Sequence, residues 1–219
     1  MTKQLIISKY CKIIDNMIFV NGKLVFSLKK NIQFSTFVKA AYRYNNMTYP
    51  KFFKMDNLSK LGLITAEFLS DEFKTKNVLG EEIGIILSNS TSSLDTDNNY
   101  QKTISNNSDY FPSPSLFVYT LPNIVTGEIC IKHKILGESV FFVSKSFDAG
   151  YIHTLVSDLI LNQGIKIVLA GWVEYLDNEY VSSLCIVKNI SEKAEITKEI
   201  INFTIENLKK IITVKKYKE

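Results

Sequence analysis

The sequence predicts an α/β domain built on a mostly parallel sheet. Three short apolar runs, at 83–88, 140–143 and 167–170, have the continuous apolar character of strands that are covered on both faces. Around them lie stretches in which apolar residues recur every three or four positions, which is the spacing of an amphipathic helix. Strands that alternate with helices in this way are typical of a mostly parallel sheet with helices packed against it.

The composition indicates one ordinary globular domain. A chain of 219 residues can bury one substantial core, so a single domain over 1–219 is expected. Hydrophobic residues make up 46% of the chain, which excludes wholesale disorder, and the net charge of +4 is too small to indicate a nucleic-acid partner. The sequence shows neither a signal peptide nor an apolar stretch of the roughly 20 residues that span a bilayer. We therefore expect a cytoplasmic protein without a membrane span.

Cysteine and histidine are scarce. Cys11, Cys130 and Cys185 are odd in number and widely spaced, which fits buried thiols in a reducing compartment. His133 and His153 are the only histidines, so neither a metal site nor a cofactor is expected.

The first part of the chain predicts a hairpin followed by a helix. Asn21-Gly22 favours a type I′ turn, because both central residues of that turn need a positive φ. From Phe34 the apolar spacing becomes helical, and Pro50 ends that helix because proline disfavours helical geometry in the residue before it. The strands expected here are 5–8, 17–20 and 23–26.

Asp56 is a suitable N-cap for the next helix, whose apolar stripe runs to Leu69. Residues 89–110 are dense in Ser, Thr, Asn and Asp, and we expect a long mobile loop there.

The later elements end in a lysine-rich helix. Lysines suit the negative pole at the C-terminal end of a helix. The expected elements are a helix at 123–131, a helix at 152–160, a strand at 180–187, and a closing helix with a basic tail within 192–219. The basic cluster consists of Lys209, Lys210, Lys215, Lys216 and Lys218.

Several short motifs occur in an order that is found in a known family. They are Lys54-Met55-Asp56 before a helix, Ser113-Pro114, Asn123 with Gly127, Gly137-Glu138 at a turn, and Ala170-Gly171-Trp172-Val173-Glu174 at a strand end. Together they resemble the first half of the β-ketoacyl synthases, thiolase-like condensing enzymes that place Ala-Gly-Gly-x-Glu at that strand end. The resemblance implies a single thiolase-like half, with a mixed, mostly parallel five-stranded sheet and helices on both faces.

The resemblance places Ser146 at the position of the family's nucleophilic cysteine. In the family a cysteine thiolate attacks an acyl thioester, and two histidines stabilise the enolate that decarboxylation forms. Ser146 would lie between a strand and a helix N-terminus suited to anions, with Asn123, Ser144 and Asp148 as candidate substrate-binding residues. The His-Gly-Thr motif and the second histidine of the family's other half do not occur in this sequence.

A serine nucleophile needs an adjacent general base, and the sequence offers none. His153 follows Ser146 by seven residues, which places it on the same helix face but roughly 10 Å along the helix, too far for a hydrogen bond. Asp148 can orient a group but cannot replace a histidine pair, Lys145 stands where the family prefers a small residue, and His133 is expected at the surface. Claisen condensation by this chain alone is not expected.

Three functions stay open. The first is a non-catalytic accessory protein that assists a condensing enzyme, because the chain is similar to the short ketoacyl synthase-like proteins of bacterial aryl polyene and flexirubin-type pigment clusters. The second is a serine-dependent acyltransferase or thioesterase that uses Ser146. The third is a stand-alone acyl-binding module. The missing histidines favour the first function over the second.

The family also implies an assembly, because its strand before the nucleophile pairs with its twin across the dimer axis. Here that strand carries Val140, Phe141, Phe142 and Val143, and an exposed apolar edge of this kind invites pairing. We expect a homodimer, or a heterodimer with a β-ketoacyl synthase, built on this strand. The basic cluster is most simply a solvated tail, and its functional alternative is a docking patch for an acidic acyl carrier protein. The expected sheet core is Ile85, Phe141, Val143, Val168 and Leu169, packed under Leu155 and Leu159.

Overall fold

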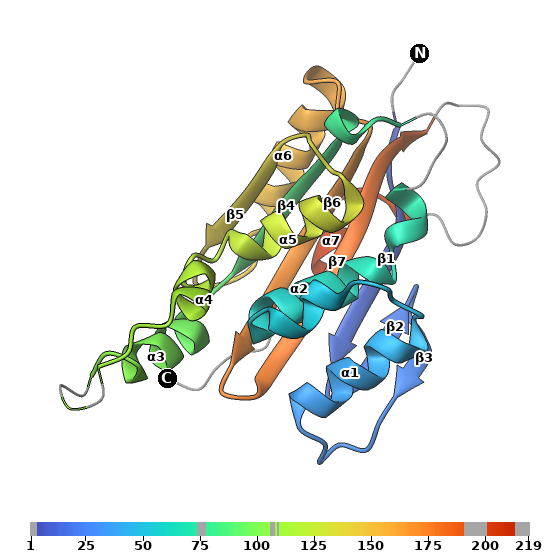
Figure 1. Cartoon of the computed structure of the whole chain (residues 1–219). Coiled ribbons are helices and arrows are strands. Elements are labelled where there is room, and N and C mark those ends of the chain that lie inside the picture. Colours follow the sequence, from blue (N-terminus) through green and yellow to red (C-terminus); the bar gives the residue numbers. More distant parts are fainter. Residues whose placement is uncertain (1–3, 74–77, 106–107, 109, 191–200, 213–219) are drawn as a thin grey trace.

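The computed structural model describes residues 4–73, 78–105, 108, 110–190 and 201–212. Within this part of the chain the strands form one mixed eight-stranded sheet in the order β3-β2-β1-β7-β6-β4-β5, with β8 paired to β1 (Figure 1). The strands are β1 (Gln4–Ile14), β2 (Met17–Val20), β3 (Lys23–Ser27), β4 (Ile83–Asn89), β5 (Ser139–Val143), β6 (Ile167–Leu176), β7 (Glu179–Ile190) and β8 (Ile201–Asn202).

Helices cover both faces of this sheet (Figure 1). One face carries α1 (Phe34–Tyr44), α2 (Asn57–Glu67) and α5 (Ile124–His133), and the other carries α6 (Ala149–Asn162) and α7 (Ile205–Ile211). Helices α3 (Leu94–Lys102) and α4 (Pro114–Phe117) lie beyond the ends of β4 and β5. Short 3₁₀ turns are η1 (Pro50–Lys54), η2 (Ser70–Phe73), η3 (Gly80–Glu82) and η5 (Val118–Thr120).

The predicted α/β class, with helices on both faces, is confirmed, whereas the strand count and the pairing differ. The described sheet has eight strands rather than five, and parallel pairing is confined to β4 with its neighbours β5 and β6. Tight turns explain the larger antiparallel part. Asn21 and Gly22 have φ angles of 49° and 76° and join β2 to β3, as the hairpin prediction required. Asp177 and Asn178 have φ angles of 48° and 64°, so β6 turns directly back as β7.

The predicted core residues are buried except at the edge strand, but they do not all lie under Leu155 and Leu159. Ile85 and Leu169 face the α2–α5 side of the sheet, whereas Val168 faces α6. Ile85, Val168 and Leu169 are fully buried, because β4 and β6 have neighbours on both sides. Val143 is 53% exposed, so its assignment to the core is wrong. It is the last residue of β5, and in the described residues β5 has a neighbour on one side only. Phe141 is half-buried for the same reason.

Two segments differ from the expected secondary structure. The segment 89–110, expected as a loop, contains helix α3. In the described residues the closing helix, expected within 192–219, begins at Ile205. Ile201–Asn202 pairs with β1, and Thr204 then caps α7 by accepting a hydrogen bond from the N–H of Asn207 (3.2 Å). Residues 191–200 and the lysines at 215, 216 and 218 lie outside the described residues.

Candidate functional site

The parallel strands β4 and β5 end at the same edge of the sheet, and the segments that follow them meet there. β4 continues into residues 90–93 and α3, and β5 continues into residues 144–148 and α6. The backbone N–H of Ser144 donates to the carbonyl of Asn89 (2.9 Å), so the two segments leave the sheet side by side. Ligands commonly bind outside the carboxyl ends of parallel strands, which makes this edge the candidate site.

Ser146 is exposed in the loop between β5 and α6. Helix α6 begins only at Ala149, and its N-cap is Asp148, whose carboxylate accepts a hydrogen bond from the N–H of Tyr151 (2.9 Å). The carbonyl of Ser146 accepts a hydrogen bond from the Ser144 hydroxyl (2.9 Å). Among the described residues, neither a histidine nor a carboxylate is hydrogen-bonded to the Ser146 hydroxyl. The general base that a serine nucleophile requires is therefore not in place there.

The other candidate substrate-binding residues have local structural partners. Ser144 and Asp148 order the β5–α6 loop and cap the helix that follows it. Asn123 is exposed at the start of α5, where its carbonyl accepts a hydrogen bond from the N–H of Gly127 (3.1 Å). The structure thus brings Ser144, Ser146 and Asp148 together in one loop and leaves Asn123 on a separate segment.

Both histidines lie on helices and contact residues of other segments. The Nε2 atom of His153 lies 3.3 Å from the carbonyl of Phe203, and the two rings stack with centroids 4.8 Å apart. His133 is not at the surface as expected, because α5 packs on α2 and leaves its side chain only 5% exposed. Its Nε2 atom lies 3.1 Å from Oε1 of Glu67, without the angle of a hydrogen bond, and its ring packs on Phe73.

Glu174 is the most heavily bonded carboxylate of this edge, and its role was not predicted. It is fully buried in β6. One carboxylate oxygen accepts hydrogen bonds from the N–H (2.7 Å) and the hydroxyl (2.5 Å) of Ser90. The other accepts from the N–H of Thr91 (3.2 Å) and from the Thr91 hydroxyl. Glu174 therefore fixes the loop that leaves β4, and the signal for it in the sequence was its place at the end of the strand-end motif.

Trp172 fills the space beneath the β5–α6 loop. It stands where the resembled family has the second glycine of Ala-Gly-Gly-x-Glu, and it is fully buried with its ring centroid 6.3 Å from that of Phe147. Its Nε1 atom has no hydrogen-bond partner among the described residues. Gly171 remains glycine for a steric reason, because its φ is 154° and a Cβ atom there would lie 2.1 Å from the carbonyl oxygen of Ser183. The Trp172 side chain thus occupies volume that a glycine at position 172 would leave open, and the Phe147 ring packs against it.

A buried polar network joins the helices that surround this edge. The Tyr119 hydroxyl donates to Oε1 of Glu128 (2.9 Å), and the Lys51 ammonium lies 2.9 Å from the same oxygen. Burial, together with the hydrogen bond to Glu128, raises the pKa of Tyr119 well above its usual range. The Thr96 hydroxyl donates to Oδ2 of Asp56 (2.9 Å), which ties α3 to the start of α2.

Two of the three thiols are too deeply buried to act as nucleophiles. Burial raises the pKa of Cys185 to about 12, and it also raises the pKa of Cys11 well above the usual range. A protonated, fully buried thiol is unreactive at neutral pH.

The described residues contain no group of three or more His, Cys, Asp and Glu side chains placed to hold a metal ion. Nor does any helix in the described ranges have both the length and the apolar character needed to cross a bilayer.

The lateral edge of the sheet, formed by the free side of β5, is a second notable feature near the candidate site. The carbonyl of Glu138 accepts from the N–H of Ile85 (2.8 Å) and the N–H of Ser144 donates to Asn89, so backbone groups at even positions face β4. Since successive backbone N–H groups alternate in direction, those of Ser139, Phe141 and Val143 point to the open side. Exposed large apolar side chains on β5 and on the segments next to it in the chain include Ile131, Leu136, Val143 and Tyr151.

Known structures share this fold. No protein-family model and no curated protein sequence matches the chain. An ishigamide ketosynthase/chain length factor superposes with a TM-score of 0.58 at 14% identity, covering 88% of this chain and 63% of the other. The ketosynthase ApeO in complex with its chain length factor ApeC, from Xenorhabdus doucetiae, gives a TM-score of 0.54 at 14% identity, covering 86% of this chain and 80% of the other.

A third solved structure is a type II polyketide synthase acyl-carrier protein in complex with its ketosynthase bound to the hexaketide, AntDE:AntF. It gives a TM-score of 0.64 at 10% identity and covers 85% of this chain and 62% of the other. The chain therefore has a thiolase-like, ketosynthase-like fold. It spans less than two thirds of the length of the ishigamide and AntDE:AntF chains.

Proposed function

We propose that this chain is a non-catalytic, ketosynthase-like subunit that assembles with a condensing enzyme of a fatty-acid or polyketide pathway in the cytoplasm. The observation that carries the proposal is the β5–α6 loop. It presents Ser146 where the resembled family has its cysteine, with no base from the described residues bonded to the hydroxyl, above a space filled by Trp172 and Phe147. The aryl polyene type of pathway is our specific choice, in line with the resemblance to the short proteins of those clusters.

The β5 edge supports the partnership. Its outward backbone groups have no neighbour in the described residues, and exposed large apolar side chains, among them Val143 and Tyr151, lie on the strand and on the segments next to it in the chain. An open strand edge surrounded by apolar side chains is a surface that pairs with another chain. The solved ketosynthases with the same fold occur in complexes with a chain length factor or with an acyl-carrier protein. We propose a ketosynthase as the partner at this edge and an acyl carrier protein as a further partner of the complex.

The catalytic part of the proposal is tested with the purified chain and with acyl and malonyl thioesters. We expect neither condensation nor exchange of carbon dioxide with malonyl thioester. Ser146→Ala is the matched control for a serine mechanism. Like the wild type, it should show no turnover above background. Turnover by the wild type that disappears in Ser146→Ala would refute the proposal and establish a serine-dependent acyltransferase or thioesterase.

The partnership is tested by affinity capture from the cells that make the protein, followed by reconstitution with the captured ketosynthase. Native mass spectrometry should show a one-to-one complex, and condensing activity should require both chains. Phe142→Lys on β5 should abolish the complex, because a charge would enter an apolar contact. Leu24→Lys on the opposite edge strand, β3, should leave it intact. Equal binding by Phe142→Lys, or a ketosynthase that is fully active alone, would contradict the proposal.

A further inference from the structure

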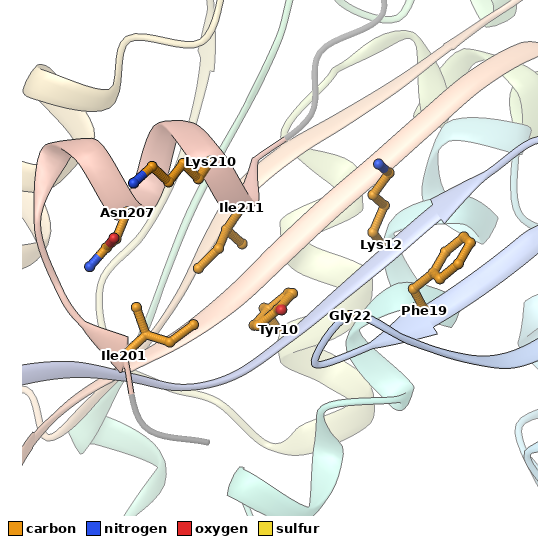
Figure 2. Close-up of a pocket in the computed structure, with 8 residues that line it drawn as sticks. All are labelled: Tyr10, Lys12, Phe19, Gly22, Ile201, Asn207, Lys210 and Ile211. Atoms are coloured by element: carbon orange, nitrogen blue, oxygen red, sulfur yellow. The ribbon is translucent and has the colours of Figure 1, made fainter. Parts of the chain in front are cut away.

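A groove opens on the α6–α7 side of the sheet, between α7 and the β1–β2 hairpin (Figure 2). Its volume is about 380 Å³. Four elements contribute most of its lining residues: Tyr10 and Lys12 come from β1, Phe19 from β2, Ile201 from β8, and Asn207, Lys210 and Ile211 from α7. Figure 2 shows the ring of Tyr10 between the isoleucines and the hairpin. The groove is therefore mainly apolar and is distinct from the β5–α6 loop.

The strand register explains why this part of the sheet is open. The β1–β7 register shifts between Ile7 and Lys9, and beyond the shift Tyr10 and Ile14 face the same side as α6 and α7. Lys12 lies between them in the alternation and faces that side too. Because α7 has only seven residues, it does not extend over the hairpin, and Tyr10 and Phe19 remain half-buried.

The charges in the groove have one sign. Lys12 and Lys210 line it, and none of the lining residues is acidic. The Lys210 ammonium is paired with Glu206 at 2.7 Å, whereas Lys12 makes no hydrogen bond or ion pair to another described residue. An ammonium group beside apolar walls, with no carboxylate facing it from the described residues, is complementary to an anion that carries an apolar chain.

We propose that this groove binds an alkyl carboxylate, with the carboxylate at Lys12 and the alkyl chain against Tyr10, Ile201 and Ile211. The volume indicates the size of ligand that the groove could hold. At roughly 30 Å³ for each heavy atom, the share of one water molecule in the liquid, the groove accommodates about a dozen heavy atoms. Decanoate has that size. The site is separate from the β5 edge, so its occupancy is independent of the proposed partnership.

The test follows the methyl groups of selectively labelled isoleucines by NMR, which suits a chain of 25.0 kDa. Titration with decanoate should give saturable shifts of Ile201 and Ile211, with a dissociation constant on the order of 0.1 mM for a ligand of this size. The methyl of Ile129, buried on the opposite side of the sheet, should not move. Decanol should bind several times more weakly than decanoate, and decylammonium more weakly still.

A charge reversal at Lys12 separates recognition of the carboxylate from general apolar binding. In Lys12→Glu, decanoate binding should fall about tenfold or more and decylammonium should become the preferred ligand. Lys39→Glu makes the same change on α1, which covers the other face of the sheet, and should leave the decanoate affinity unchanged. Lys12→Gln should weaken decanoate without favouring decylammonium. Thermal melting of each variant confirms that it is folded.

Three results would overturn the proposal. The first is the absence of saturable shifts at Ile201 and Ile211 in the wild type. The second is an equal affinity for decanoate and decylammonium, or an unchanged preference in Lys12→Glu. The third is a shift of the same methyl groups that depends on protein concentration without any ligand, which would mean that a second copy of the chain occupies the groove.

Discussion

Asp56 and Glu174 each hold a local segment in place through hydrogen bonds to their carboxylates, and the sequence predicted only the role of Asp56. Asp56 was predicted as an N-cap, and its carboxylate accepts a hydrogen bond from the N–H of Ser59 (3.0 Å). Glu174 was identified only as part of a strand-end motif, because its partners Ser90 and Thr91 lie more than 80 residues away in the chain. Local caps are readable from sequence because both partners are neighbours, whereas long-range partners are not.

The first prediction concerns Glu174. In Glu174→Gln the amide nitrogen would face donors of Ser90 or Thr91, so at least one buried donor would lose its acceptor. We expect a loss of unfolding free energy of about 1.5–3 kcal/mol, measured by denaturant unfolding. Glu206→Gln, on the exposed side of α7, is the control and should change the stability little. Equal stability of Glu174→Gln and the wild type would show that the four hydrogen bonds do not hold the loop.

The second prediction is a pH dependence at Asp56. Burial raises the pKa of this carboxyl above its ordinary value of 3.8, and the hydrogen bonds from Ser59 and Thr96 only partly oppose the rise. The folded chain therefore binds the proton more tightly than the unfolded chain, so ionisation lowers stability as the pH rises from 3.8 through the folded pKa.

Asp56→Asn should remove this loss, because asparagine is also a good N-cap and its amide can donate to the Thr96 hydroxyl. Relative to the wild type, Asp56→Asn should gain stability between pH 4 and pH 7, in denaturant unfolding at each pH. Asp56→Ala loses the cap and should be less stable throughout, by about 1 kcal/mol. A difference between Asp56→Asn and the wild type that does not vary with pH would disprove the assignment.

Among the elements, α3 is a helix that the sequence did not predict, since residues 89–110 were expected to form a loop. Only Thr96 of this helix is buried, so the segment has no apolar periodicity that could have predicted it. Polar contacts hold it instead, since the Ser93 hydroxyl donates to the carbonyl of Thr120 (2.6 Å) and Thr96 donates to Asp56. In contrast, α6 was predicted well, because Ile152, Val156 and the other buried positions repeat at helical spacing.

The third prediction tests the central strands. Val168 is fully buried on β6, between β7 and β4. In Val168→Asp an unpaired charge would enter the core, and the expected cost of several kcal/mol is enough to unfold the domain. Leu155→Asp should destabilise less, because that side chain is half-buried. The exposed Leu24 of β3 is the control, and Leu24→Asp should melt near the wild-type temperature. Cooperative unfolding of Val168→Asp at an unchanged temperature would disprove the assigned orientation of β6.

At the scale of the whole molecule, the sequence predicted the α/β class from three apolar runs, and these became β4, β5 and the first part of β6. The antiparallel half of the sheet was underestimated because β7 is buried along nearly its whole length, so its pairing with both β1 and β6 leaves no alternating pattern in the sequence. The candidate site was located only in part. Motif order placed Ser144, Ser146 and Asp148 in one loop, but the filling of the space beneath it by Trp172 and Phe147 depends on packing between separate segments.

The last prediction concerns assembly through the β5 edge in the absence of a partner. A twofold-related copy can pair with the outward N–H and carbonyl groups of Ser139, Phe141 and Val143, since an antiparallel contact of a strand with itself is self-complementary. Light scattering of the purified chain should therefore give the mass of a dimer. In Val143→Pro the ring removes one outward N–H and leaves the hydrogen bonds to β4 intact, so the protein should fold and become monomeric. Val143→Thr keeps the N–H and the β-branched shape, and it should remain a dimer. A wild-type monomer at high protein concentration, or a dimeric Val143→Pro, would mean that this edge is not the interface.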